Sequence, residues 1–431
     1  MKELIVILYT TLYRKGGAQF QRVAETMAKE LASSENEVIC KAIESKQEIR
    51  EVFRKITEEG NEIDQFHFIG HSGMYGPMYG TVQYPEQFSP FEIEKLEIPF
   101  SKDAEAIFHC CRSARWFAPY FARVQKVKTA GYHWYTTFSE RKDKYKIPLR
   151  SKGNLYCFGC PGKKSHGWMA SMKKMLDQMK PEALKSFEPS LEKIDDTYNS
   201  VAALYAETFK DIKVRKDEFN WILKHLPDKA ISVLDVGCGN GALLNELSDS
   251  ISSGLGVDVS DQLLEFARDL NKGNDQIKFQ KIDGPTLPFQ DHSFDLVISL
   301  LSYRYLDWDP IMIEIERVLK KDGKLLIVDM VTAPVKVKEW PSLLKGKFLH
   351  YMNRFTQPEF HKNLNRLVTD PGWSQMLKYN PIRSQHEMKW YLESRFPGRK
   401  VEVINIGMHS RILAFDSKDM NDIKNIELTY P

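Results

Sequence analysis

The sequence predicts an α/β protein made of two doubly wound domains. Short apolar runs alternate with amphipathic stretches along both halves of the chain, which is typical of parallel strands joined by crossover helices. A charged, proline-punctuated stretch separates the halves. The length of 431 residues allows two or three domains at about one per 150 residues. We therefore expect a first domain at 1–180, a linker at 181–197, a second domain at 198–418 and a C-terminal tail at 419–431.

The first half opens on an apolar run, Leu4–Leu8, that predicts a buried strand. Strand and helix patterns then alternate, which predicts a sheet with right-handed crossovers and ligands at the carboxyl ends of its strands. His71 and Cys111 each follow directly on such a strand. The expected strands are 4–11, 37–43, 65–69, 104–109, 127–135 and 155–158, and the expected helices are 18–31, 46–57, 114–124 and 166–180.

The second half follows the same pattern after two introductory helices. Its fourth strand is apolar throughout, as expected of a central parallel strand. The expected strands are 231–236, 255–257, 277–282, 296–300 and 324–329, and the expected helices are 201–209, 216–225, 242–247, 311–319 and 385–396.

A glycine-rich turn joins the first strand of this half to its helix, with Gly237, Gly239 and Gly241 at alternate positions. Glycine permits positive φ and close backbone approach to a ligand. The spacing differs from the dinucleotide fingerprint, which has two residues between its second and third glycines. The next two strands end in Asp258 and Asp283, and an acidic residue at the second strand end can accept hydrogen bonds from a ribose diol.

The pattern resembles the class I S-adenosylmethionine-dependent methyltransferases. The carrying motifs are D-x-G-x-G-x-G at 235–241, L-P-F-x-D-x-S-F-D at 287–295 and E-x-x-R-V-L-K-x-x-G at 314–323. The resemblance implies a Rossmann-like domain with S-adenosyl-L-methionine as cofactor. It assigns the methionine end to Asp235 and the glycine turn, the ribose to Asp258, the adenine to Asp283 and the floor beneath the sulfonium to Leu300. The implied cofactor-binding set is Asp235, Gly237, Cys238, Gly239, Gly241, Asp258, Asp283, Gly284 and Leu300.

The chain departs from this group after the fourth strand, where a histidine is common. Here the run Ser302–Tyr305 directs phenols and a guanidinium toward the acceptor. A phenol with a pKa near 10 orients an acceptor better than it accepts a proton. Tyr303 and Tyr305 are therefore expected to bind the acceptor, unless they only wall the pocket.

A long insertion, 331–383, is expected to form a lid over the acceptor. It holds nine Lys and Arg residues against three Asp and Glu, in a chain of net charge +3, with aromatic residues interleaved. Arg354 and Arg366 are the residues expected to draw an anionic small molecule. The alternative is a helical lid whose lysines are a solvated face and whose aromatics form its core.

The first domain resembles the caspase-like cysteine peptidases, in particular the bacterial CHAT group. The resemblance is carried by the motifs at 67–73 and 108–114 and by a strand at 130–134. It implies a dyad with Cys111 as nucleophile and His71 as proton acceptor. Two alternatives are a packed cysteine in an inactive scaffold, and Ser72 as the nucleophile of an incomplete G-x-S-x-G elbow.

The six cysteines indicate neither a disulfide framework nor a metal centre. Cys110 and Cys111 are adjacent, and Cys157, Cys160 and His166 would still need a further ligand for zinc. We expect reduced thiols, no metal and a cytoplasmic location. The N-terminus lacks a secretory signal, and no apolar run approaches the 18–20 residues that span a bilayer, so no membrane partner is expected. The near-neutral charge and the lack of a nucleic-acid module argue against a nucleic-acid partner.

Together these features predict a methyltransferase acting on a small molecule, with anionic acceptors favoured by the charged lid. The caspase-like domain would scaffold, regulate or recruit, including by binding a protein partner. The alternative is a cysteine peptidase or signalling effector in which the methyltransferase fold is a cofactor-responsive module.

Overall fold

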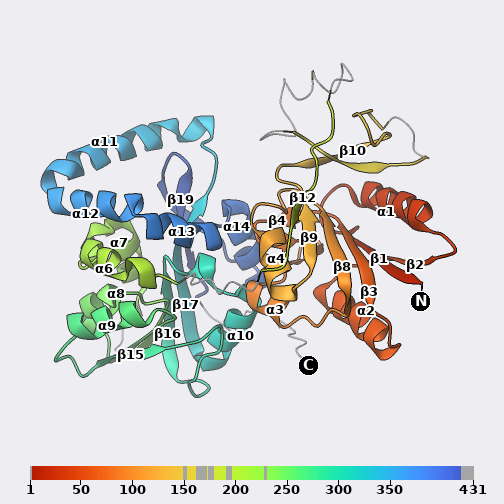
Figure 1. Ribbon diagram of the computed structural model, residues 1–431. Coiled ribbons are helices and arrows are strands. Elements are labelled where there is room, and N and C mark those ends of the chain that lie inside the picture. The colour runs from red at the N-terminus through yellow and green to blue at the C-terminus, as the bar shows by residue number, and fades with distance from the viewer. Residues whose placement is uncertain are drawn as a thin grey trace. The chain divides into compact units, whose positions relative to one another are not determined.

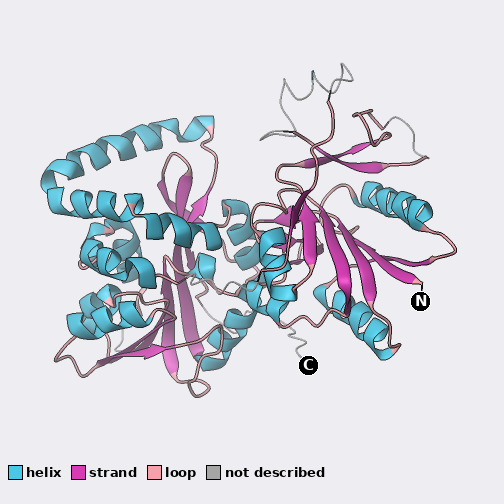
Figure 2. Cartoon of the chain, viewed as in Figure 1, coloured by secondary structure: helices cyan, strands magenta, loops and turns pink. Residues whose placement is uncertain are grey.

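The computed structural model describes residues 2–148, 153–161, 172, 179–190, 197–227 and 231–418. The chain divides into two compact units, Met1–Lys193 and Ile194–Pro431 (Figure 1). Figure 2 shows strands at the centre of each unit and helices around them. No helix within the described ranges is long and apolar enough to cross a lipid bilayer.

The first unit is built on a six-stranded sheet with the order β12-β9-β8-β3-β1-β2. Five strands are parallel, and β12 at one edge runs antiparallel to β9. β1 lies inside the sheet because residues 4–9 are all buried. The main elements are β1 (Glu3–Tyr9), α1 (Gly17–Leu31), β2 (Asn36–Ala42), α2 (Lys46–Glu58), β3 (Ile63–Ile69), α3 (Pro90–Glu94), β8 (Phe100–His109), α4 (Phe117–Gln125), β9 (Lys128–Gly131) and β12 (Lys185–Phe187). Short strand pairs follow β3, namely β4 (Ser72–Gly73) with β5 (Gly76–Pro77) and β6 (Tyr79–Gly80) with β7 (Pro85–Glu86).

The far edge of this sheet differs from the sequence prediction. The strand expected at 127–135 ends at Gly131. A Cβ on Gly131 would lie 2.5 Å from the Ser113 hydroxyl oxygen. The same oxygen accepts a hydrogen bond from the Tyr132 N–H. The chain therefore leaves the sheet, and β10 (Thr136–Ser139) pairs antiparallel with β11 (Tyr156–Gly159). The strand expected at 155–158 is thus not a member of the parallel sheet.

One further segment differs from the sequence prediction, and two predicted segments lie mostly outside the described residues. Residues 185–187, expected in the linker, form β12 against β9. Most of the helix expected at 166–180, including His166, lies outside the described residues, as does the tail at 419–431.

Two histidines occupy the interior of the first sheet. His67 on β3 and His109 on β8 are buried, and their rings stack with His67 Nδ1 3.1 Å from His109 Nε2. Burial lowers the pKa of His67 to about 4. Burial, together with the His67 charge, lowers the pKa of His109 to about 3. Both rings are therefore neutral in the folded protein near neutral pH.

The first unit is expected to lose stability as the pH falls below 6.5. Both folded pKa values lie below the ordinary value of 6.5, so the unfolded chain takes up protons first. Stability present above pH 6.5 is then lost as the pH falls toward the folded values. Between pH 7 and 5 the loss should be roughly 1–2 kcal/mol for each histidine.

Hydrogen exchange of the β3 and β8 amides, corrected for the intrinsic rate at each pH, measures this loss. The double variant His67→Gln, His109→Gln should flatten the pH dependence, with the amides of the second unit as internal reference. If the stability of the double variant fell with pH as steeply as that of the wild type, groups other than these two histidines would cause the acid sensitivity.

The second unit is built on a seven-stranded sheet with the order β15-β14-β13-β16-β17-β19-β18. Its first five strands are parallel, and β18 and β19 add an antiparallel hairpin that the sequence analysis did not identify. The strands are β13 (Ser232–Val236), β14 (Ser253–Asp258), β15 (Ile277–Lys281), β16 (Phe294–Leu300), β17 (Leu319–Thr332), β18 (Glu402–Ile406) and β19 (Ser410–Asp416).

Helices cover this sheet, and apolar clusters fill the space beneath them. Within the expected lid, 331–383, the structure contains α11 to α13. The helices are α6 (Ala202–Thr208), α7 (Lys216–His225), α8 (Ala242–Leu247), α9 (Asp261–Leu270), α10 (Trp308–Val318), α11 (Trp340–Thr356), α12 (Pro358–Thr369), α13 (Pro371–Tyr379) and α14 (Gln385–Arg395), with short 3₁₀ turns η1 (Asn199–Val201), η2 (Ile212–Val214), η3 (Ser248–Ser250), η4 (Tyr303–Tyr305) and η5 (Val337–Glu339).

Candidate functional site

The strand order of the second unit reverses between β13 and β16. From β13 the chain moves outward to β14 and β15 on one side, and then returns to β16 and β17 on the other. In open α/β sheets, ligands bind at the carboxyl ends of the strands where the order reverses in this way. The glycine turn after β13 and the turn after β16 lie at this reversal point.

The glycine turn depends on positive φ at Gly237 (+77°), Gly239 (+55°) and Gly241 (+70°). A Cβ on Gly237 would lie 2.4 Å from the Cβ of Ser302, so this glycine allows the two turns to pack together. Among the described residues other than its chain neighbours, a Cβ on Gly239 would have only the Tyr205 ring within 4 Å, at 3.5 Å. Gly239 therefore leaves room beside the backbone where a ligand can approach.

Asp258 ties this turn to the end of β14. Its Oδ2 accepts a hydrogen bond from the Gly239 N–H and its Oδ1 accepts one from the Ser260 N–H, each at 2.9 Å. Burial raises the pKa of Asp258, while these backbone donors oppose the shift. Because each carboxylate oxygen can accept two hydrogen bonds, Asp258 retains capacity for a ribose diol.

Asp235 on β13 is a buried carboxyl with an unsatisfied oxygen. It is 2% exposed, and its Oδ1 has no hydrogen-bond partner among the described residues. Burial, with a contribution from the Asp258 charge, raises the pKa of Asp235 to about 8. An unpaired buried carboxyl oxygen beside a ligand turn fits a cationic ligand group, because such a pair satisfies both partners.

The turn after β16 is strained and held to the end of β13. Leu301 has φ +58°, unusual for a large side chain, and its N–H donates to the Val328 carbonyl at 2.7 Å. The Ser302 and Ser299 hydroxyls both donate to the Val236 carbonyl, at 2.7 and 3.1 Å. Backbone strain of this kind is concentrated at binding sites, and no sequence pattern near Leu301 indicates it.

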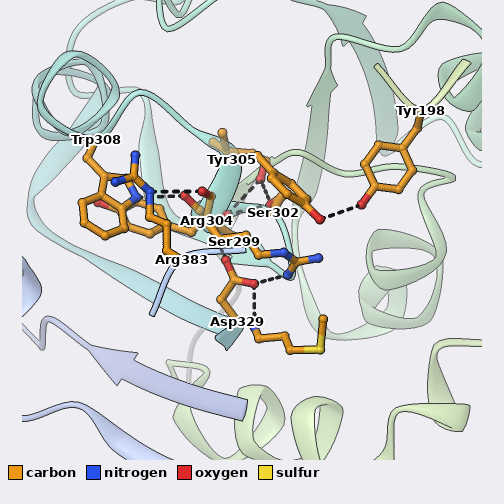
Figure 3. A network of polar contacts seen from close by, with 11 residues as sticks. Tyr198, Ser299, Ser302, Arg304, Tyr305, Trp308, Asp329 and Arg383 are labelled. Atoms are coloured by element: carbon orange, nitrogen blue, oxygen red, sulfur yellow. Dashed lines mark hydrogen bonds and ion pairs between the residues drawn. The ribbon is translucent and has the colours of Figure 1, made fainter. Parts of the chain in front are cut away.

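A buried ion pair lies beneath this turn (Figure 3). The Arg304 guanidinium pairs with Asp329, which is 0% exposed, and lies 4.4 Å from the Tyr305 ring centroid. Arg383 Nε donates to the Arg304 carbonyl at 3.2 Å and stacks on Trp308 at 3.8 Å. The Arg304 guanidinium is therefore buried and ion-paired with Asp329, and its expected orientation toward the acceptor stays a prediction.

Four aromatic side chains gather beside the glycine turn, and we call them the aromatic cluster: Tyr198, Tyr205, Tyr305 and Trp373. The Tyr198 ring centroid lies 5.3 Å from that of Tyr205, 6.2 Å from Tyr305 and 5.9 Å from Trp373. The Tyr198 hydroxyl donates to the Tyr305 hydroxyl at 3.4 Å, and Figure 3 shows the two facing each other. Tyr305 was expected as an acceptor residue and Trp373 as one of the lid aromatics, but sequence reasoning missed Tyr198 and Tyr205, whose only signal was their helical spacing.

The segment that carries Tyr198 and Tyr205 is anchored to the glycine turn and the start of α9. The Asn240 amide donates to the Phe209 carbonyl at 3.1 Å, and the Ser260 hydroxyl donates to Asn199 Oδ1 at 2.7 Å. The aromatic cluster is therefore fixed relative to the carboxyl ends of β13 and β14.

The other expected cofactor residues occupy varied environments. The Asp283 side chain is 89% exposed, and Gly284 after it has φ +90°. Cys238 is buried, and its N–H donates to a β14 carbonyl, whereas Leu300 is half-buried at the end of β16.

The expected acceptor residues do not lie together. Tyr303 is fully buried against Trp308, within the core. Tyr305 is half-buried in the aromatic cluster. Arg354 is exposed on α11, and Arg366 on α12 is ion-paired with Glu207 at 3.2 Å.

The first unit brings His71 and Cys111 to one edge of its sheet, because they follow the adjacent parallel strands β3 and β8. His71 Nε2 lies 2.9 Å from the Lys15 carbonyl, and Cys111 Sγ lies 3.3 Å from Thr136 Oγ1. Within the described part of the chain, no hydrogen bond joins the His71 ring to Cys111 Sγ. Burial lowers the pKa of His71.

The alternative sites in this unit also have observable partners. Ser72, the alternative nucleophile, donates its hydroxyl proton in a hydrogen bond to the Cys111 carbonyl. Cys160 is buried in an apolar cluster with Phe158. Among the residues that the structure describes, no group of three or more His, Cys, Asp or Glu side chains could hold a metal ion.

The second unit has the form of a Rossmann-like α/β protein that binds a nucleoside-containing cofactor. The family model described as a methyltransferase domain matches residues 234–327. The chain is 30% identical to the uncharacterized methyltransferase YcgJ of Bacillus subtilis over 197 residues, which cover 44% of this chain and 74% of that protein. It is 26% identical to demethylmenaquinone methyltransferase of Staphylococcus aureus over 195 residues, covering 44% and 78%.

A solved S-adenosylmethionine-dependent methyltransferase from Aquifex aeolicus is 18% identical, with a TM-score of 0.34, and the match covers 52% of this chain and 99% of that one. On the strength of the YcgJ match, the chain belongs to the methyltransferase family, and its cofactor is S-adenosylmethionine. The unpaired Asp235 oxygen, the open side of Gly239 and the accepting Asp258 carboxylate all fit this cofactor.

Proposed function

We propose that the chain transfers a methyl group from S-adenosylmethionine to a small molecule held beside the aromatic cluster. The bound cofactor supplies an electrophilic methyl group on its sulfonium. Asp258 would accept from the ribose hydroxyls, and Asp283 would accept from the adenine amine. Asp235 and the glycine turn would hold the methionine end, with Leu300 as an apolar floor. The observation that carries the proposal is the position of the aromatic cluster next to Gly239.

The cluster suits an acceptor that stacks and forms hydrogen bonds. Burial raises the pKa of Tyr198, so its phenol keeps its proton and can donate toward an acceptor or to Tyr305. These phenols would orient the acceptor in line with the methyl group, which is the main requirement for this transfer. Proton removal by a phenolate plays no part in the scheme.

The charged lid offers weaker support for an anionic acceptor. Arg366 is already paired with Glu207, and Arg354 is exposed on α11. These placements favour recognition by ring contact and hydrogen bonds over recognition by charge. The alternative within this proposal is an anionic acceptor drawn by the lid charges. In that case kcat/KM should fall as the ionic strength rises.

Release of S-adenosylhomocysteine tests the transfer. The full chain is incubated with S-adenosylmethionine and a small-molecule extract, and mass spectrometry detects S-adenosylhomocysteine together with an extract component that gains the mass of one methyl group. Cys111→Ala should leave both signals unchanged, while Asp258→Ala should reduce them at limiting cofactor. Product that depends on Cys111, or a complete lack of product from a cofactor-bound protein, would contradict the proposal.

A caspase-like cysteine site in the first unit is the second candidate function. It is supported by the common sheet edge of His71 and Cys111 and by the strained residue Arg112, at φ +61°, directly after the cysteine. In this scheme Cys111 loses its proton to His71 and attacks a peptide carbonyl, the peptide C–N bond breaks as His71 returns the proton to the leaving amine, and water then hydrolyses the thioester. If the first unit has no peptidase activity, we propose that it acts as a scaffold or regulator of the methyltransferase unit or recruits a protein partner.

Iodoacetamide labelling at neutral pH tests the dyad. If His71 activates Cys111, Cys111 should react ahead of Cys40, the exposed cysteine that serves as internal reference. His71→Ala should slow labelling of Cys111 without changing that of Cys40. If Cys111 were labelled at the same rate in the wild type and in His71→Ala, Cys111 would be a packing residue without a catalytic partner.

A further inference from the structure

Helix α11 presents a row of large apolar side chains to solvent. Phe348 is 64% exposed and Phe355 is 67% exposed. At 3.6 residues per turn, the exposed apolar positions of this helix fall within an arc of roughly 120°. We call these residues the α11 stripe: Trp340, Leu344, Phe348, Tyr351, Met352 and Phe355.

Away from the stripe, α11 contacts the protein mainly through Leu343, which is the one buried side chain among the described residues of this helix. A Cβ on Gly346 would lie 3.9 Å from the Ile406 carbonyl of β18. Before the helix, Glu339 is ion-paired at 2.7 Å with Arg411, a buried residue of β19. Figure 1 shows α11 running along α12. The helix is therefore anchored at Leu343 and before its first turn, and the stripe points away from these contacts.

Basic residues lie at both borders of the α11 stripe. At 3.6 residues per turn, Lys345 follows one border, and Lys347 and Arg354 follow the other. The 17 residues of α11 include no Asp or Glu. Long basic side chains at these positions can lie beside the apolar row while their charges reach a flat anionic surface.

From this arrangement we infer that α11 binds the surface of an anionic lipid bilayer, lying in its plane with the stripe among the acyl chains. An apolar row of Trp, Phe and Leu flanked by Lys and Arg is the pattern of an interfacial helix. A second copy of this chain is a poorer occupant, because pairing two stripes would bring basic borders together. The sequence-based expectation of no membrane partner rested on the lack of a spanning run, and a helix in the interface needs none.

Vesicle co-sedimentation of the full chain tests the inference, using phosphatidylcholine vesicles with and without phosphatidylglycerol. We expect binding to the anionic vesicles that weakens with salt. The double variant Phe348→Ser, Phe355→Ser should lower the partition coefficient by about tenfold or more, since each phenylalanine loses its burial. Lys345→Gln, Lys347→Gln should lower it about fivefold per charge on anionic vesicles alone.

The matched control is Phe266→Ser, which removes a partly exposed phenylalanine from α9 and should leave binding unchanged. Equal binding of the Phe348→Ser, Phe355→Ser variant and the wild type would overturn the inference, as would equal binding to both vesicle types. Self-association in lipid-free sedimentation velocity that this double variant abolishes would assign the stripe to a second copy instead. None of these readouts depends on methyl transfer, so the inference can fail or succeed independently of the proposed function.

Discussion

Replacing Asp258 by alanine is expected to weaken the binding of S-adenosylmethionine by about tenfold or more. The change removes the carboxylate proposed to accept hydrogen bonds from the ribose, each worth roughly 1.5–3 kcal/mol when the acceptor is charged. It also removes the acceptor for the Gly239 and Ser260 N–H groups, so the glycine turn loses its tie to β14. Both effects act on the cofactor site and reinforce each other.

Titration calorimetry of the full chain measures this loss, and Asp261→Ala is the matched control. Asp261 begins α9 close to Asp258 in the chain, but it is exposed and paired with Lys281 at 2.7 Å. Its removal should change the affinity little. Unchanged binding in a folded Asp258→Ala protein would show that the ribose is held elsewhere.

The sequence was informative where local pattern alone determines structure. The glycine turn was recognisable because alternate glycines follow an apolar strand, and all three adopt positive φ. The strand ends that carry Asp258, His71 and Cys111 were predictable for the same reason, because each apolar run stops where the polar residue begins. Parallel pairing then brings neighbouring strand ends to one edge.

What the sequence could not supply are contacts between distant segments. Tyr198 and Trp373 belong to separate parts of the chain, and only the folded unit brings their rings within 5.9 Å. Arg304 presents the same difficulty, because its partner Asp329 lies on β17 and nothing near Arg304 in the sequence indicates a buried counter-ion. The break after Gly131 depends on Ser113 in the same way.

Replacing Arg304 by methionine is expected to destabilise the second unit by roughly 3–5 kcal/mol, because it leaves a buried carboxylate without its counter-ion. Asp329 is 0% exposed and also accepts hydrogen bonds from the Arg304 and Met330 N–H groups. The double variant Arg304→Met, Asp329→Asn should recover much of the loss, since the neutral amide oxygen can still accept from the backbone.

The pH dependence distinguishes a buried charge from lost packing. Burial raises the pKa of Asp329, and the Arg304 guanidinium opposes this shift, so its removal raises the folded pKa further. With a folded pKa above the unfolded value, the carboxyl costs stability at neutral pH and less as the pH falls toward about 4. Hydrogen exchange of the β16 and β17 amides should therefore show an Arg304→Met deficit that shrinks in acid and is nearly independent of pH in the double variant. A deficit that is the same at every pH would mean that the guanidinium stabilises this unit by its packing and not by its charge.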